Sequence, residues 1–296
     1  MTRRFAQLAW AAAACTYFLI ILGAIVRITG SGMGCGDHWP LCNGRLLPPL
    51  DLPTLIEYAH RLATALVTIL VAATAGYGWW LQRETGNRKR ETSNGPIALP
   101  SDRPTATAGE SFRVRPSVAS YAALGLLIPQ VALGAVTVKL ALPPWTVILH
   151  LGTAMLLLAA LIVAARGSRS VPRSGAGVVA LALGFTAVLA GALTANLGAA
   201  SACLGFPLCN GQLAPDGNSL QHVHWTHRLL AYTLFAYTLW WAVRTRGRWA
   251  WGAVALVILQ VAVGAVMVLL ALPPPWQAVH VAVGAAVWAA LVLAVA

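Results

Sequence analysis

Four of the seven histidines lie inside long apolar segments, where a polar side chain is costly and usually has a function. Each of these histidines in the first half of the chain has an equivalent in the second half. His150 and His280 are separated by 130 residues, and His60 and His227 are separated by 167 residues. Two imidazoles on neighbouring helices can clamp a planar metal macrocycle between them. The histidines therefore predict two bis-histidine haem sites, one formed by His60 with His150 and one by His227 with His280.

Other chemistries are open to these histidines. A membrane histidine can be a hydrogen-bonded packing residue that ties two helices together. Non-haem zinc or iron normally takes three or four protein ligands, and neither half of the chain offers enough. The sequence contains no C-x-x-C-H motif, which excludes covalent c-type haem attachment.

Glu57 is the only carboxylate inside a predicted membrane span, and it precedes His60 by three residues on the same helix face. The position 167 residues later holds His224, so the acid occurs in one half only. One interpretation is proton handling beside the first haem. The other is an acid near a helix N-terminus, favoured by the dipole and paired with Arg27 or Arg61. Because the acid occurs only in the N-terminal half, the sequence predicts a reactive site in that half and a plainer haem site in the C-terminal half.

Two arginines recur immediately after the histidines, Arg61 after His60 and Arg228 after His227. Each could reach a haem propionate at the outer membrane boundary. Ordinary interfacial snorkelling explains them equally well.

Four cysteines are also duplicated, as Cys35 with Cys42 and Cys203 with Cys209, in loops on the predicted outer face. That compartment is oxidising, so a disulfide within each loop is permitted. A structural role, a redox role for the first pair, and metal binding by Cys35 and Cys42 with His38 are the alternatives.

The elements that must position these residues are membrane helices. Of the 296 residues, 58% are hydrophobic and 9% are charged, and the mean hydropathy is +0.72, which excludes an ordinary soluble domain. Windows of about 20 apolar residues predict eight transmembrane helices in an all-α protein. The predicted spans are 6–28, 55–80, 118–139, 146–165, 177–197, 224–243, 249–270 and 277–296.

The net charge of +12 acts as a topological signal, because fifteen of the twenty Lys and Arg residues fall at the N-terminus and in alternate loops. We therefore expect a multi-pass protein of the plasma membrane with both termini in the cytoplasm. Nucleic-acid binding is not expected, since the basic residues are split among four segments. The polar segment 82–117 is predicted to be a cytoplasmic linker.

The chain is internally repeated. QVALGAVTVKLALPP at 130–144 matches QVAVGAVMVLLALPP at 260–274 in twelve of fifteen positions, and PLCNGRLLP at 40–48 matches PLCNGQLAP at 207–215 in seven of nine. We expect two pseudo-symmetric four-helix bundles, related by a pseudo-two-fold axis along the membrane normal. The N-terminal repeat comprises 1–81 and 118–170, and the C-terminal repeat comprises 171–296.

These motifs together resemble the haem A synthase family, over nearly the whole chain. The resemblance rests on G-S-G-M-G-C at 30–35, the two P-L-C-N-G loops, E-Y-A-H-R at 57–61, H-W-T-H-R at 224–228, and the histidines of spans four and eight. The long linker departs from the pattern.

The resemblance implies an oxidoreductase that converts the C8 methyl group of haem O to a formyl group, giving haem A for haem-copper oxidases. It assigns His60 and His150 to the substrate haem O, and His227 and His280 to a haem B cofactor that relays electrons. It also gives Glu57 a catalytic role and implies the disulfides Cys35–Cys42 and Cys203–Cys209.

Two histidines on one iron leave no position for oxygen. Either one ligand leaves during turnover, or the bound haem is oxidised at its edge. Expected partners are membrane lipid and a farnesyltransferase that supplies haem O; a homo-oligomer is compatible with the sequence, and no motif specifies the electron donor.

Two other functions use some of the same residues. A bis-haem electron-transfer protein, working between quinol and an outer acceptor, would need the four histidines but gives no reason for Glu57. A thiol-oxidising membrane enzyme would use Cys35 and Cys42, and leaves the matched histidines unexplained.

Overall fold

The computed structural model describes residues 2–93, 116–167, 175–216 and 218–296. These residues form eight α-helices, each overlapping one predicted span, with two short 3-10 helices after α1 and α5. The α-helices are α1 (Arg3–Ile28), α2 (Leu52–Ser93), α3 (Pro116–Lys139), α4 (Pro144–Arg166), α5 (Gly175–Asn196), α6 (Ser219–Thr245), α7 (Arg248–Leu269) and α8 (Pro274–Val295), and the 3-10 helices are η1 (Ser31–Met33) and η2 (Ala199–Ala202).

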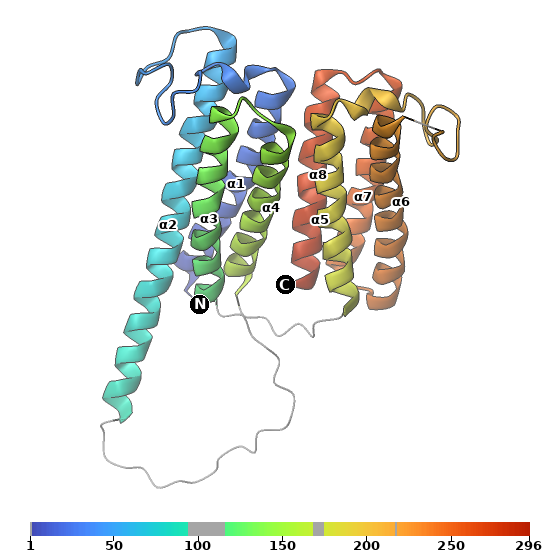
Figure 1. The fold of residues 1–296 in the computed structure, drawn as a ribbon. Helices are drawn as coiled ribbons and strands as arrows, with labels where there is room; N and C mark the ends of the chain where they lie inside the picture. Colours follow the sequence, from blue (N-terminus) through green and yellow to red (C-terminus); the bar gives the residue numbers. More distant parts are fainter. Residues whose placement is uncertain (1, 94–115, 168–174, 217) are drawn as a thin grey trace.

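Seven of these helices are long and apolar enough to cross a membrane, which makes the chain a multi-pass membrane protein. The helix outside that group is α6, whose first turns carry His222, His224, His227 and Arg228. These polar residues lower its hydropathy, although α6 lies alongside the other helices in Figure 1. The predicted crossing by α6 therefore stays a prediction.

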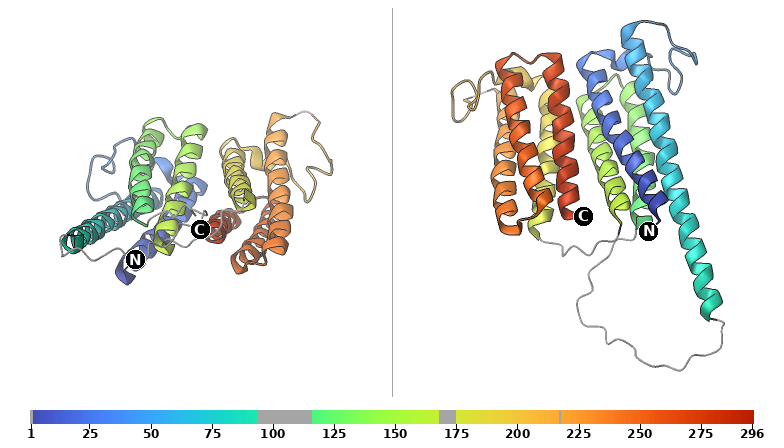
Figure 2. Two further views of the ribbon diagram at one scale, coloured as in Figure 1. Left: turned by 90° about the horizontal axis from the view of Figure 1, so that it is seen from below. Right: turned by 180° about the vertical axis from the view of Figure 1, so that it is seen from behind.

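The helices lie in two groups, α1–α4 and α5–α8, side by side in all views (Figures 1 and 2). Hydrogen bonds join the groups: the Tyr17 hydroxyl donates to the Ala282 carbonyl (2.9 Å), and the Trp288 indole N–H donates to the Met155 carbonyl (2.8 Å). The pseudo-two-fold relation and the domain boundaries remain predictions.

The repeated Ala-Leu-Pro-Pro segments, 141–144 and 271–274, form matching turns before α4 and α8. Their leucines have φ of 63° and 65°, and each leucine N–H donates 2.8 Å to a carbonyl five residues earlier. Both helices then begin at the second proline, which fits the first helical turn because it needs no N–H donor there. The shared turn places His150 and His280 at the same depth in their helices.

The loop between α1 and α2 is tied to the start of α2. Oδ1 of Asp51 accepts from the Thr54 backbone N–H at 3.1 Å, which caps the helix. Hydrogen bonds from Thr54 lower the pKa of Asp51. A fixed helix start holds Glu57 and His60 in the following turns.

Part of the predicted cytoplasmic linker is helical, because α2 continues to Ser93. Residues 116–117 of the predicted linker begin α3, and 94–115 lie outside the described residues, as do 168–174. The basic residues that supported the topology and fall in these segments are Arg103, Arg113, Arg115, Arg169 and Arg173.

Both termini lie on one side of the protein, opposite the cysteine loops (Figure 1). We predict that the side with the termini faces the cytoplasm. In a Cys15→Ala background, an impermeant maleimide applied to intact cells should label Leu213→Cys, in the second cysteine loop, and spare Thr245→Cys, at the end of α6. Both positions are exposed in the protein, so the side of the membrane decides access. Labelling of position 245 with protection of position 213 would reverse the predicted orientation.

Candidate functional site

All eight helices line one cavity of about 940 Å³, and all four span histidines face it. Its other lining residues are mostly apolar, from Leu19 and Ile20 on α1 to Val281 and Trp288 on α8. This volume lies at the upper end of the range for small-molecule and cofactor pockets. The structure therefore brings together the two histidine pairs that the repeat predicted.

Each histidine ring packs against a glycine of the preceding helix. A β-carbon at any of the four glycines would lie only 2.9–3.2 Å from a ring atom, closer than ordinary packing allows. Sequence analysis missed these glycines, although they recur with the histidines. The pairs are Gly23 with His60, Gly134 with His150, Gly191 with His227, and Gly264 with His280.

Three of the rings are also held by hydrogen bonds. Nδ1 of His227 lies 3.1 Å from the Ala187 carbonyl oxygen. The Gln130 amide nitrogen lies 3.2 Å from Nε2 of His150, and the corresponding Gln260–His280 distance is 3.1 Å. Nδ1 of His150 and of His280 is buried and has no partner among the described residues.

The arrangement fits haem. The ring centroids of His227 and His280 are 6.4 Å apart with an interplanar angle of 80°. An imidazole nitrogen lies about 2 Å from a metal that it binds, so the 6.4 Å separation leaves room for one metal ion between the rings. The unpartnered ring nitrogens and the apolar walls suit a metal macrocycle. Among the described residues, no three His, Cys, Asp or Glu side chains gather as they would for a non-haem metal.

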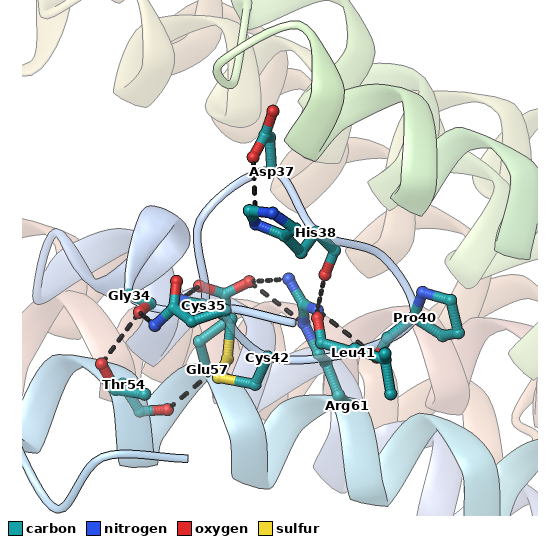
Figure 3. A network of polar contacts seen from close by, with 11 residues as sticks. Gly34, Cys35, Asp37, His38, Pro40, Leu41, Cys42, Thr54, Glu57 and Arg61 are labelled. Atoms are coloured by element: carbon teal, nitrogen blue, oxygen red, sulfur yellow. Dashed lines mark hydrogen bonds and ion pairs between the residues drawn. A yellow bond between two sulfur atoms is a disulfide. The ribbon is translucent and has the colours of Figure 1, made fainter. Parts of the chain in front are cut away.

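Glu57 is 3% exposed, and both of its carboxylate oxygens are bound (Figure 3). Oε2 accepts from the Cys35 backbone N–H at 2.7 Å. Oε1 accepts from Nη2 and Nε of Arg61 at 2.6 and 3.2 Å. Of the two arginines predicted as partners, Arg61 pairs with Glu57, whereas Arg27 donates to the Ala195 carbonyl and the Gln277 side chain.

Arg61 fastens the first cysteine loop to α2. Its Nη1 donates to the carbonyls of His38 and Leu41 at 2.8 and 2.6 Å, and more weakly to that of Pro40 at 3.5 Å (Figure 3). Pro40 and Leu41 line the cavity, so this contact holds the loop against the end of the cavity that lies away from the chain termini (Figure 1). Contact between Arg61 and a haem propionate stays a prediction.

Arg228 fastens the second cysteine loop in the same way. It donates to the carbonyls of Cys203, Gly205 and Leu208 at 2.8–2.9 Å. Its Nε lies 3.3 Å from Nε2 of His224, which occupies the position of Glu57. Contact between Arg228 and a haem propionate also stays a prediction.

The cysteines form disulfides within each loop, Cys35–Cys42 and Cys203–Cys209, and all four are buried. Because Cys35 and Cys42 are joined, their thiolates are not free to bind metal with His38. The His38 imidazole instead lies 3.3 Å from the exposed carboxylate of Asp37. The disulfide therefore braces the loop that Arg61 holds.

The chain is similar in sequence to known haem A synthases. The chain is 32% identical to haem A synthase of Bacillus licheniformis over 85% of this chain and 82% of that protein. It is 30% identical to haem A synthase of Symbiobacterium thermophilum over 92% of this chain and 88% of that protein. Residues 6–292 match the COX15-CtaA family, described as cytochrome oxidase assembly protein. With this match over almost its full length, the chain belongs to the COX15-CtaA family of haem A synthases.

Proposed function

We propose that this protein is a haem A synthase, an oxidoreductase that converts the C8 methyl group of haem O to a formyl group. The observation that carries the proposal is the apolar cavity lined by His60 of α2, His150 of α4, His227 of α6 and His280 of α8, with His224 of α6 as a fifth histidine in the lining. Family membership supports the same reaction, since the relatives above bear that name.

The two histidine pairs receive different roles. His60 and His150 hold the substrate haem O, and His227 and His280 hold a haem B cofactor. Bound haem B supplies electron transfer. The Ala187 carbonyl orients the ring of His227, which leaves its second nitrogen free for a metal. The hydrogen bonds that cross between α1 and α8 and between α4 and α8 keep the two sites in one cavity.

Glu57 is assigned the proton-accepting role in the N-terminal half. Oxidation of a methyl group releases protons, and among the described residues Glu57 is the one carboxylate that lines the cavity. The equivalent residue of the other half, His224, is buried but carries no carboxylate. Arg61 balances the charge of Glu57 while the Cys35 N–H fixes its orientation.

We further propose the cellular setting. The protein lies in the plasma membrane with both termini in the cytoplasm, surrounded by lipid. A farnesyltransferase supplies its haem O, an electron donor completes the reaction, and copies of the chain associate as a homo-oligomer.

Replacement of a histidine should remove the haem of its own half. Extraction and chromatography of the purified wild-type protein should yield haem B together with haem O or haem A. His280→Ala should lose haem B, and His150→Ala should lose haem O and haem A, because each variant lacks one ligand. His222→Ala is the matched control: this histidine is exposed, lies on α6 outside the cavity lining, and should leave both haems bound.

Two results of this extraction would contradict the proposal. Haem B alone, in both sites, would indicate an electron-transfer protein. A complete lack of haem would favour the thiol-oxidising enzyme.

Glu57→Gln should retain haem but stop the oxidation. The amide can still accept a hydrogen bond from Cys35, whereas it cannot take a proton as a carboxylate does. Haem O or a hydroxylated intermediate should therefore accumulate, as measured by chromatography and mass spectrometry of extracted haems.

The control for this variant is Thr54→Val. It removes the Thr54 hydroxyl that donates 2.8 Å to the Gly34 carbonyl in the same loop, without touching the carboxylate. Haem A formation should persist in Thr54→Val. A normal yield of haem A from Glu57→Gln would disprove the proton-accepting role.

A further inference from the structure

The repeated segments Gln-Val-Ala-Leu-Gly (130–134) and Gln-Val-Ala-Val-Gly (260–264) contain a polar residue that the proposed function leaves unused. Gln130 lies on α3 and Gln260 on α7, each one turn before a glycine that receives a histidine ring. Residues four apart share one face of a helix. Each of these two helices therefore presents an amide and a glycine to the same imidazole.

The two halves repeat this contact closely. The amide nitrogen of Gln130 is 3.2 Å from Nε2 of His150, and that of Gln260 is 3.1 Å from Nε2 of His280. A β-carbon at Gly134 or Gly264 would lie 3.1 Å from Cε1 of the same ring. The glycine fixes how closely the ring approaches the helix, and the amide fixes its rotation.

Each pair also contains unused polar atoms. Nδ1 of both histidines and Oε1 of both glutamines are buried without a partner among the described residues. Buried polar atoms are nearly always hydrogen-bonded, so each pair has one acceptor oxygen and one ring nitrogen whose bonding capacity is unused. An imidazole that binds a metal through one nitrogen keeps its proton on the other and donates it to an acceptor.

A glutamine amide can supply that acceptor. Half a turn of the amide would direct Oε1, instead of the amide nitrogen, at the ring nitrogen that it now faces. His227 shows the same principle with a different acceptor, since its Nδ1 lies 3.1 Å from a backbone carbonyl.

We propose that Gln130 and Gln260 are positioning residues for the axial histidines, and that each sets the orientation and electron-donor strength of the ligand in its own half. Gln130 acts through His150 on the substrate haem, and Gln260 acts through His280 on haem B. The inference rests on the proposed function, because it requires these histidines to be haem ligands.

The test compares full-length purified Gln130→Leu, Gln260→Leu and Gln260→Glu with the wild type. The measurements are haem content, the electron paramagnetic resonance signals of each ferric haem, and the midpoint potential of each haem. Loss of a residue that supports a metal ligand typically weakens metal binding roughly 10–100-fold. We expect that loss, with shifted signals, for haem B in Gln260→Leu and for the substrate haem in Gln130→Leu.

The potential distinguishes positioning from simple packing. Without an acceptor the His280 ring is a weaker electron donor, so the midpoint potential of haem B should rise in Gln260→Leu. Gln260→Glu keeps an acceptor oxygen and should return the potential and the signals towards the wild type. Gln212→Leu is the matched control and should leave both haems unchanged, because Gln212 lies outside the cavity lining and bonds to Asp216.

Unchanged haem signals and potentials in both leucine variants would overturn the inference. Equal disturbance of both haems by either variant would overturn it too, since that pattern indicates general loss of packing. A wild-type protein purified without haem would instead refute the proposed function. The two failures are therefore distinguishable.

Discussion

Polar side chains inside an apolar helix bundle must find partners within the protein, and this requirement governs the half of the molecule that carries the cysteine loops. Arg61 and Arg228 satisfy it by binding loop carbonyls, which fastens both cysteine loops over the cavity. Glu57 satisfies it with Arg61 and the Cys35 amide. The two cysteine loops are thus held to the starts of α2 and α6 by a small number of buried charges and their partners.

The same requirement explains the small residues beside the histidines. A ring inside the bundle needs space next to a neighbouring helix, and glycine supplies it in all four cases. The glycines bring neighbouring helices close to the rings, while Gln130, Gln260 and the Ala187 carbonyl restrict ring rotation. Space and orientation for each ring are thereby provided by residues of the neighbouring helix.

Much of this arrangement could be predicted from sequence because it is periodic. Hydropathy located the helices, and the repeat matched the histidines and the cysteine pairs. The pairing of Glu57 with Arg61, four residues along the same helix, follows from helix geometry. Contacts between distant segments could not be predicted in this way: the Cys35 N–H that binds Glu57 and the loop carbonyls that bind Arg61 depend on how the loop folds back onto α2. The mean hydropathy of α6 is also lowered by His224, His227 and Arg228, which line the cavity and lie in the first turns of the helix.

The comparison of Glu57 with His224 bears on why the acid is present. Both residues are buried and bind the arginine one turn further along, and both arginines hold a disulfide loop. The C-terminal half shows that an imidazole, which can be neutral, is sufficient to build this contact. Since the imidazole builds the same contact, loop anchoring alone does not require an acid at position 57. The acid at this position is consistent with the proton-accepting role that we propose for Glu57 in the N-terminal half.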